Sequence, residues 1–384
     1  MQNGLDGDFQ AYKSSDLTVQ DARILRELAP DDATAAPTGA PTMAPSAAPT
    51  AIALVPPIKA IVKPAPRGPL MIGLSDNMLP VARQAELGAK FQAVVKFQSV
   101  QKMRYPFLVK PHLDAGFQSV MVMEFLDATR HTNLKQIANG LYDKYLYKFV
   151  DELMDDGNRE VWVRPLHEFN GDWYPWGTYR GGDNTKRMFK RAWRHVHWIL
   201  TNKGANIKFQ LAYNCVNGQN DQTTPFLDWW PGEQYVDMVV CSGYNRAGSD
   251  ADHQQWLTFP EVFGAAYEQM LTLPGMKPLG VGETSCNNFE DNDKAQWIRD
   301  AFYDFVNTYP RIEHVTWFLQ NKNDGRWDLN SPEEIAAFGE SLIEYTPQNI
   351  PQDLPPLPPQ ADINGDGVIN GDDAPVEAPP DPNL

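Results

Sequence analysis

One carboxylate set among aromatic side chains is the most informative chemical feature of this sequence. Glu168 lies in the segment VWVRPLHEFNGDWYPWG, residues 161–177. Its ionisable or aromatic neighbours there are His167, Trp173, Tyr174 and Trp176. Aromatic faces stack on pyranose rings, and an apolar wall raises the pKa of a carboxyl group so that it can donate a proton near neutral pH. Most Trp-rich segments are ordinary core, but this density of polar side chains is hard to bury, so the pattern predicts an acid that acts on a sugar.

A second carboxylate that could take part is Glu283, in KPLGVGETSCNN at residues 277–288. Glycoside hydrolysis needs two carboxyl groups across the scissile bond: one protonates the leaving oxygen, and the other is a nucleophile or activates water. A metal site is the competing interpretation of paired carboxylates, but it would need more Asp, Glu or His side chains than these segments offer. Whether Glu168 and Glu283 meet depends on the fold.

Eight apolar, β-prone runs alternate with amphipathic stretches of helical period. The runs occupy residues 69–74, 93–99, 119–126, 161–166, 207–213, 236–244, 277–283 and 314–320. Helical patterns cover residues 137–157, 185–204, 292–310 and 331–345, the last opening with a capping box at Ser331 and Glu334. The alternation predicts an α/β protein, a (β/α)8 TIM barrel. An open doubly wound sheet is the alternative, but no glycine-rich phosphate loop follows the first run.

The barrel prediction places the candidate residues on one face. In a (β/α)8 barrel the active site lies at the carboxyl ends of the strands. Glu168, Asn214, Tyr244 and Glu283 end or closely follow the fourth to seventh predicted strands. Strands four and seven face each other across the barrel mouth, so we expect the two glutamates to converge there.

Low-complexity segments flank the predicted barrel and divide the chain into five parts. They are a short N-terminal segment (1–32) with a helical pattern at 14–28, an Ala/Pro/Thr linker (33–66), the barrel (67–346), a Pro-rich linker (347–360) and an acidic end (361–384). Segments so rich in Ala, Pro and Thr cannot bury a core, so we expect the two linkers to be extended and disordered.

The acidic end contains DINGDGVINGDD, which matches an EF-hand-type calcium loop. Oxygen ligands fall at the required positions, with Gly367 at the sharp turn: Asp362, Asn364, Asp366, Val368 through its carbonyl, Asn370 and Asp373. The loop resembles half of a dockerin repeat, which implies structural Ca²⁺ and a cohesin-like module as partner. A truncated dockerin, an isolated calcium loop and an acidic tail all stay open.

Composition excludes several classes of function. A formal net charge of −16 disfavours nucleic acid or an anionic membrane as partner. No apolar run reaches the roughly 18–20 residues that span a bilayer. The first residues lack a signal-peptide pattern, so either a signal was removed before Met1 or the chain is not secreted by that route. The cysteines at 215, 241 and 286 are too few for a disulfide scaffold; one bridge and three free thiols are both open.

Four motifs in order along the chain resemble glycoside hydrolase family 26, the β-mannanase and β-1,3-1,4-glucanase family. RPLHEFNGDWYPWG resembles the acid/base motif of that family, and PLGVGETS resembles its nucleophile motif. YVDMVVCSGYN resembles the strand whose tyrosine stands beside the nucleophile, and WFLQNKNDGRWDLNS resembles the loop after the eighth strand. The resemblance covers residues 69–345 and implies a TIM barrel that needs no cofactor for catalysis.

The resemblance implies a role for each matching residue. Glu168 would be the general acid/base and Glu283 the nucleophile of a retaining mechanism, with Tyr244 hydrogen-bonded to the nucleophile. His167 would contact sugar hydroxyls, and Trp173 would stack on a sugar at the cleavage point.

Further residues are implied with less specific roles. Trp176, Asn214 and Trp327 would line the cleft, while Arg164 would point into the barrel and orient one of the two glutamates. Many mannanases of the family have WFWWG where this chain has WYPWG, so Pro175 removes one aromatic side chain, and the motif resembles the glucanase-like and uncharacterised branches more closely.

Together these features predict a secreted, monomeric, retaining endo-β-glycanase that acts on a cell-wall polysaccharide. The expected substrate is β-1,4-mannan, followed by mixed-linkage β-1,3-1,4-glucan and then β-1,3-xylan. Two hypotheses of another class are a non-catalytic carbohydrate-binding barrel and a scaffold component that docks through the calcium loop. Polysaccharide cleavage distinguishes the enzyme from both.

Overall fold

The structure is a computed structural model that describes residues 70–126, 132–218, 224–323 and 325–346. The N-terminal helical pattern, both Pro-rich linkers and the calcium-loop residues 362–373 lie outside these ranges. Among the helices described, none is long and apolar enough to cross a membrane.

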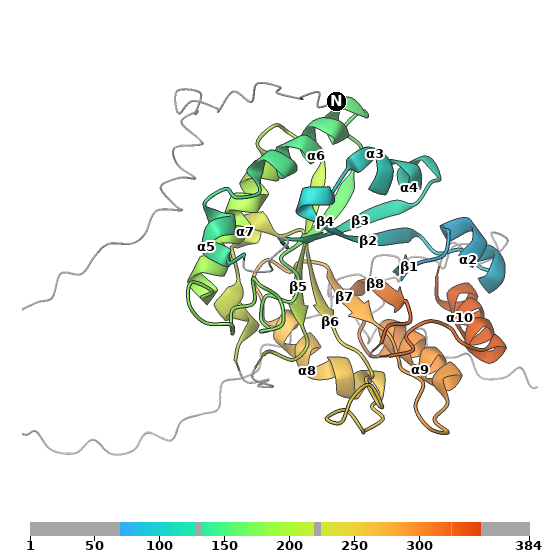
Figure 1. The fold of residues 1–384 in the computed structure, drawn as a ribbon. Helices are drawn as coiled ribbons and strands as arrows, with labels where there is room; N and C mark the ends of the chain where they lie inside the picture. The colour runs from blue at the N-terminus through green and yellow to red at the C-terminus, as the bar shows by residue number, and fades with distance from the viewer. Residues whose placement is uncertain (1–69, 127–131, 219–223, 324, 347–384) are drawn as a thin grey trace, which may run out of the picture. The chain divides into compact units, whose positions relative to one another are not determined.

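Eight parallel strands close into a barrel in sequence order, which confirms the predicted (β/α)8 fold (Figure 1). The strands are β1 (Met71–Asp76), β2 (Ala93–Ser99), β3 (Gln118–Glu124), β4 (Val161–Pro165), β5 (Ile207–Asn214), β6 (Met238–Ser242), β7 (Leu279–Thr284) and β8 (Ile312–Leu319). The barrel closes through β1 and β8, where Met71 pairs with His314 and Asp76 with Leu319. Each predicted run overlaps one strand, with ends that differ by up to two residues, because a strand buried on both faces leaves a continuous apolar signal.

Helices surround the strands on the outside of the barrel (Figure 1). They are α2 (Pro80–Leu87), α3 (Tyr105–Leu108), α4 (Lys110–Asp114), α5 (Leu134–Ala138), α6 (Asp143–Asp155), α7 (Lys186–Thr201), α8 (Phe259–Leu271), α9 (Lys294–Asn307) and α10 (Pro332–Tyr345). Three 3-10 turns are η2 (Val100–Lys102), η3 (Phe226–Trp229) and η4 (Glu233–Tyr235). The last two are the regular elements described between β5 and β6.

Two helix predictions need correction. The pattern over 137–157 is two helices, because Gly140 takes a φ of 90° between α5 and α6, a conformation that favours glycine. At the start of α10, Ser331 accepts the Glu334 amide as expected. The Glu334 carboxylate, however, accepts the Asn330 amide instead of the Ser331 amide, so only half of the predicted capping box forms.

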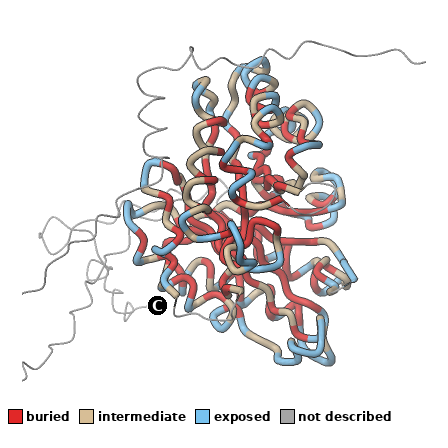
Figure 2. Tube along the Cα trace, turned by 60° about the vertical axis from the view of Figure 1, so that its left-hand side comes forward, coloured by how far each residue is buried: buried red, intermediate tan, exposed pale blue. Residues whose placement is uncertain are grey.

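The main apolar core fills the layer between the strands and the helices. Figure 2 shows buried residues concentrated along the barrel and exposed ones on the outer turns. Two small apolar clusters are separate from this core: Val95, Val120 and Val122 form one, and Ala212, Met238 and Val240 the other, with Trp162 packed against both. One of the two cysteine arrangements left open by the sequence is observed: Cys215, directly after β5, forms a disulfide with Cys241 on β6, and Cys286 is free and buried.

Candidate active site

Glu168 sits on a backbone turn that directs it out of the end of β4. Leu166 and Glu168 both have positive φ, 54° and 53°, which is uncommon for residues other than glycine. The Glu168 amide donates to the Ala212 carbonyl of β5 at 2.8 Å. Such a conformation persists only where its surroundings hold it, and it is typical of functional sites.

Two neutral donors hold the Glu168 carboxylate. The indole N–H of Trp173 donates to one oxygen at 2.7 Å, and the Asn214 amide donates to the other at 2.9 Å. The Asn214 side chain cannot turn round, because its own oxygen accepts the Val216 amide. Burial, assisted by the charge of Glu283, raises the pKa of Glu168 to about 7. A carboxyl group with this pKa can hold a proton near neutral pH and release it during a reaction.

Glu283, at the end of β7, has cations and a phenolic hydroxyl as neighbours. The Tyr244 hydroxyl donates to Glu283 Oε2 at 2.7 Å, and Arg164 Nη1 lies 3.8 Å from Oε1. Burial raises the pKa of Glu283, while Arg164, the Tyr244 hydroxyl and Lys322 act in the opposite direction. Arg164 acts more strongly on Glu283, its ion-pair partner, than on Glu168, so Glu283 is the one that stays ionised when the pair holds a single proton.

Arg164 lies inside the barrel and ties four strands together. Its guanidinium donates to Gln210 on β5, to the Gly282 carbonyl on β7 at 2.5 Å and to Thr316 on β8 at 2.9 Å. Burial lowers the pKa of Arg164 to about 10, which leaves the guanidinium charged at neutral pH. Of the two glutamates offered as partners by the sequence, the structure places Arg164 beside Glu283.

Replacing Arg164 with methionine should therefore change both stability and pH dependence. We expect the free energy of unfolding to fall by about 3–5 kcal/mol, because Gln210, Thr316 and Glu283 lose a buried partner. Removing the cation favours the neutral form of Glu283, so its pKa rises and the acidic limb of kcat/KM moves to higher pH. Urea unfolding and a pH–rate profile measure the two effects, with Arg164→Lys as the charge-retaining control. An acidic limb that stays in place would contradict this role.

His167 is completely buried beneath the mouth of the barrel. Its ring contacts Tyr174, with centroids 4.5 Å apart, and Phe97 at 5.7 Å. Burial lowers the pKa of His167 to about 3, so the ring is neutral. Within the described part of the chain, neither ring nitrogen has a hydrogen-bond partner, and the same holds for Glu283 Oε1 and the Ser242 hydroxyl. Buried polar atoms normally find partners, so these unpartnered atoms distinguish the barrel mouth from ordinary core.

The two tryptophans that follow Glu168 occupy different environments. Trp173 is 43 % exposed and presents ring surface to solvent beside Glu168. Trp176 is completely buried, stacks on Tyr174 and donates its indole N–H to the His167 carbonyl at 2.8 Å. Trp176 therefore supports the loop from below, whereas Trp173 can contact a ligand.

Trp327, in the loop after β8, packs against the ring of Tyr244. The ring centroids are 5.3 Å apart and Trp327 is nearly buried. The loop is held by the buried ammonium of Lys294, which donates to the Arg326 and Asp328 carbonyls. Trp327 thus restrains Tyr244 and, through it, Glu283.

Several residues of the site were not predicted from the sequence. Asn170 pairs with both backbone groups of Asn214, at 2.7 and 2.8 Å. Phe318 contacts Phe97 and Tyr244, and Lys322 lies over the Phe318 ring. Asn170 follows Glu168 in the same motif and was within reach of sequence reasoning. Phe97 and Phe318 were not, because they read as ordinary strand residues.

The predicted metal ligands lie outside the described ranges. Among the residues that the structure describes, no group of three or more His, Cys, Asp or Glu side chains could hold a metal ion. The site formed by Glu168 and Glu283 is thus a pair of carboxyl groups with protein hydrogen-bond partners.

The chain is similar in sequence to a known protein family and to several of its relatives. The model of glycosyl hydrolase family 26 matches residues 94–273. Endoglucanase H of Acetivibrio thermocellus is 33 % identical over 237 residues, which is 61 % of this chain and 26 % of the relative. Mannan endo-1,4-β-mannosidase A and B of Caldalkalibacillus mannanilyticus is 26 % identical over 210 residues, covering 52 % of this chain and 36 % of the relative. The chain therefore spans only about a quarter to a third of the length of these two relatives.

A solved structure shares the fold. A family 26 β-mannanase from Bacteroides ovatus superposes with a TM-score of 0.52 at 14 % sequence identity, covering 71 % of this chain and 88 % of that one. At this identity the likeness establishes the barrel alone.

Proposed function

We propose that this barrel is a retaining endo-β-glycanase of glycosyl hydrolase family 26, the family whose model matches residues 94–273, and that it acts on a cell-wall polysaccharide. The observation that carries this proposal is the contrast between the two buried carboxyl groups. Glu168 has only neutral donors and a pKa of about 7, whereas Glu283 has Arg164 and Tyr244 beside it. One group is suited to carry a proton and the other to carry a charge.

The proposed reaction uses these two states in sequence. Glu283 attacks the anomeric carbon while Glu168 gives its proton to the leaving oxygen, which produces a covalent glycosyl-enzyme and a shortened chain. Glu168, now ionised, takes a proton from water, and the water oxygen displaces Glu283 from the anomeric carbon. Two inversions give net retention.

The names of the relatives support particular polysaccharides as substrates. The relative named a mannan endo-1,4-β-mannosidase supports β-1,4-mannan, the substrate expected from the sequence. The relative named an endoglucanase has the higher identity of the two and supports a β-glucan as second candidate, as does Pro175. Product release from mannan, mixed-linkage β-glucan and β-1,3-xylan, measured in parallel, tests the proposal. ¹H NMR of the first-formed product should give the β-anomer; binding without cleavage of any polymer would favour the non-catalytic alternative.

We propose further that the protein works outside the cell as a monomer and that the loop at residues 362–373 binds Ca²⁺ and docks a cohesin-like module. An insoluble polysaccharide cannot enter a cell, and the loop has the spacing of oxygen ligands that calcium requires. Calcium titration of the full chain by calorimetry, with Asp362→Ala as control, tests the loop. No heat of binding at millimolar calcium would remove it from the proposal.

The pH dependence should follow the two carboxyl groups. We expect a bell-shaped profile of kcat/KM, because the active form has Glu168 protonated and Glu283 ionised. Activity falls as pH rises through the pKa of Glu168, about 7, and falls at low pH as Glu283 gains a proton. A profile that stays flat from pH 6 to 9 would contradict the proton assignment.

Trp173→Phe should move the basic limb of this profile while keeping an aromatic ring. The substitution removes the indole N–H that donates to Glu168 Oε2. Losing a donor to the charged form raises the pKa of Glu168, so the basic limb moves to higher pH and kcat/KM falls by less than about tenfold.

A second variant displaces the Trp173 ring while leaving Trp173 itself in the sequence. A β-carbon on Gly171 would lie 2.5 Å from the Trp173 ring, so Gly171→Ala must displace that ring. It should shift the basic limb in the same direction. A shift to lower pH in both variants would show that the indole does not stabilise the Glu168 carboxylate.

A further inference from the structure

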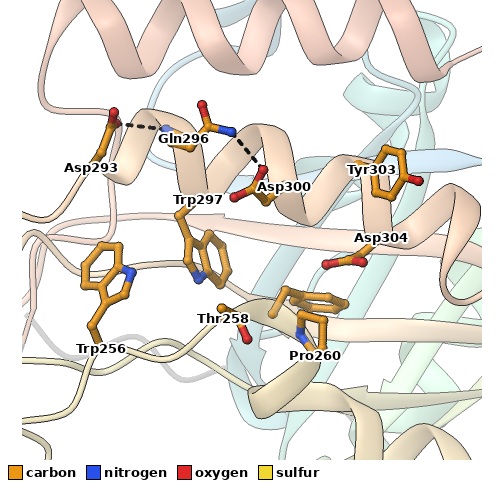
Figure 3. A pocket seen from close by; sticks show the side chains of 10 residues that line it. Trp256, Thr258, Pro260, Asp293, Gln296, Trp297, Asp300, Tyr303 and Asp304 are labelled. Carbon is orange, nitrogen blue, oxygen red and sulfur yellow. Dashed lines mark hydrogen bonds between the residues drawn. The ribbon is translucent and has the colours of Figure 1, made fainter.

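A cavity on the outer flank of the barrel contains none of the residues of the carboxylate site. It has a volume of about 470 Å³ and lies between the segment that leads into α8 and the exposed face of α9 (Figure 3). Its size is within the range of cavities that hold small ligands. Both helices begin after the carboxyl ends of their strands, so the cavity starts on the same side of the barrel as the glutamates.

The α9 wall presents polar and aromatic side chains in one row. Gln296, Asp300 and Tyr303 follow one another at spacings of four and three residues, which places them on one helix face. The row is about 10 Å long, from the rise of an α-helix. Tyr303, at one end, is 55 % exposed. It also lines a second, smaller cavity toward α10, so the surface continues beyond the row.

The opposite wall is an aromatic segment that is anchored to α9. Trp256 is partly buried against the core, and in Figure 3 it lies toward the end of the cavity away from Tyr303. The indole N–H of Trp297 donates to the Leu257 carbonyl at 2.8 Å, which fixes the segment that carries Trp256. Thr258 then caps α8 with a complete capping box. The aromatic wall is therefore preorganised.

The carboxylates of the cavity suit hydroxyl groups better than a cation. Asp293 accepts the Gln296 amide at 2.9 Å, Asp300 accepts the Gln296 side chain at 2.8 Å, and Asp304 accepts the Thr308 hydroxyl. Each of these bonds uses one of the two acceptor oxygens. Their charges, within a chain of net charge −16, repel anionic polymers. Open aromatic rings with uncharged and acceptor groups between them match a neutral, hydroxyl-rich sugar chain.

We propose that this cavity, the α8–α9 groove, is a second binding site for a neutral β-glycan chain, outside the catalytic cleft. Trp256 and Tyr303 stack on sugar rings, and Gln296 and Asp300 bind hydroxyls between them. The proposal rests on the proposed function for the identity of the polymer. A second site on the same side of the barrel keeps a long substrate attached between cleavage events.

The test separates binding from cleavage. The full chain carrying Glu283→Ala is run through gels that contain soluble mannan or mixed-linkage β-glucan, so that the polymer stays intact. Adding Trp256→Ala or Tyr303→Ala should weaken retention about threefold to tenfold, whereas Trp256→Phe should retain most of it. Phe107→Ala is the matched control, because Phe107 is an aromatic residue 71 % exposed elsewhere. In the active chain, both alanine variants should cut a short oligosaccharide within about twofold of wild type.

Three results would overturn the groove. If Trp256→Ala and Tyr303→Ala migrate like the Glu283→Ala parent, the groove does not bind the polymer. If these variants, in the active chain, lose activity equally on short and long substrates, the substitutions distort the catalytic cleft. Retention abolished by a chelator would assign the carboxylates to a cation. The proposed function fails separately: if the wild type cleaves no glycan while the groove variants still lose retention, the groove stands and the catalytic assignment falls.

Discussion

Glu283→Ala is expected to abolish polysaccharide cleavage, with a loss in kcat of roughly 10,000-fold or more. The substitution removes the carboxylate that forms the ion pair with Arg164, at 3.8 Å, and that Lys322 also helps to keep ionised. Without it no covalent intermediate forms, and Glu168 has no charged partner across the bond. Reducing-sugar release under saturating substrate measures the loss. Glu268→Ala, an exposed glutamate on α8, is the control that should leave the rate unchanged.

Chemical trapping is a second, independent test of Glu283 as the nucleophile. A 2-deoxy-2-fluoro glycoside with a good leaving group slows the second step of a retaining enzyme, so the glycosyl-enzyme accumulates. Peptide mapping should then find the added mass on Glu283 in wild type and no label in Glu283→Ala. A label on Glu168, or a Glu283→Ala variant that keeps a tenth of the activity, would overturn the nucleophile assignment.

Glu168→Ala should give a different kinetic signature, because Glu168 acts in both steps. On polysaccharide we expect a loss of about 100- to 10,000-fold, since the leaving sugar oxygen needs a proton. An aryl glycoside with an acidic leaving group needs none, so its first step continues and the intermediate accumulates as a burst. Azide needs no base to attack, and it should restore turnover and give the β-glycosyl azide.

The azide product distinguishes two mechanisms. A β-azide requires two inversions and therefore a covalent intermediate on Glu283. An α-azide, or no effect of azide at all, would indicate a single inversion with water activated by one carboxylate. Asn214→Ala is a useful companion, because it keeps Glu168 but removes one of its donors; it should respond to pH and not to azide.

The features that could be predicted from the sequence are those set by interactions between residues close together in the chain. The eight strands could be predicted because burial on both faces leaves a local apolar run, and each predicted run overlaps its strand. Ser331 marked the start of α10 for the same reason, since a helix cap involves residues three positions apart. The division of the 137–157 pattern was missed, because a single glycine at φ 90° outweighs an amphipathic period.

In the candidate site, too, some features could be predicted from local motifs and others could not. Glu168 and Glu283 stood out because each sits in a dense local motif, and the strand order then predicted that they meet. Local motifs, however, do not reveal which way a side chain faces. Trp173 and Trp176 are three residues apart in one motif, yet one contacts Glu168 and solvent and the other is completely buried under His167.

The sequence by itself determined the fold class and the two carboxylates, because both are written in short stretches of residues. Only the tertiary structure decided the proton assignment, since the pKa of Glu168 depends on burial and on Glu283, and the charge of Glu283 depends on Arg164, 119 positions earlier in the chain. The α8–α9 groove is also a feature that only the tertiary structure decided. Trp256 and Tyr303 belong to separate crossovers, and only barrel closure places them around one cavity. Long-range electrostatics and concave surfaces arise from packing, which no local pattern encodes.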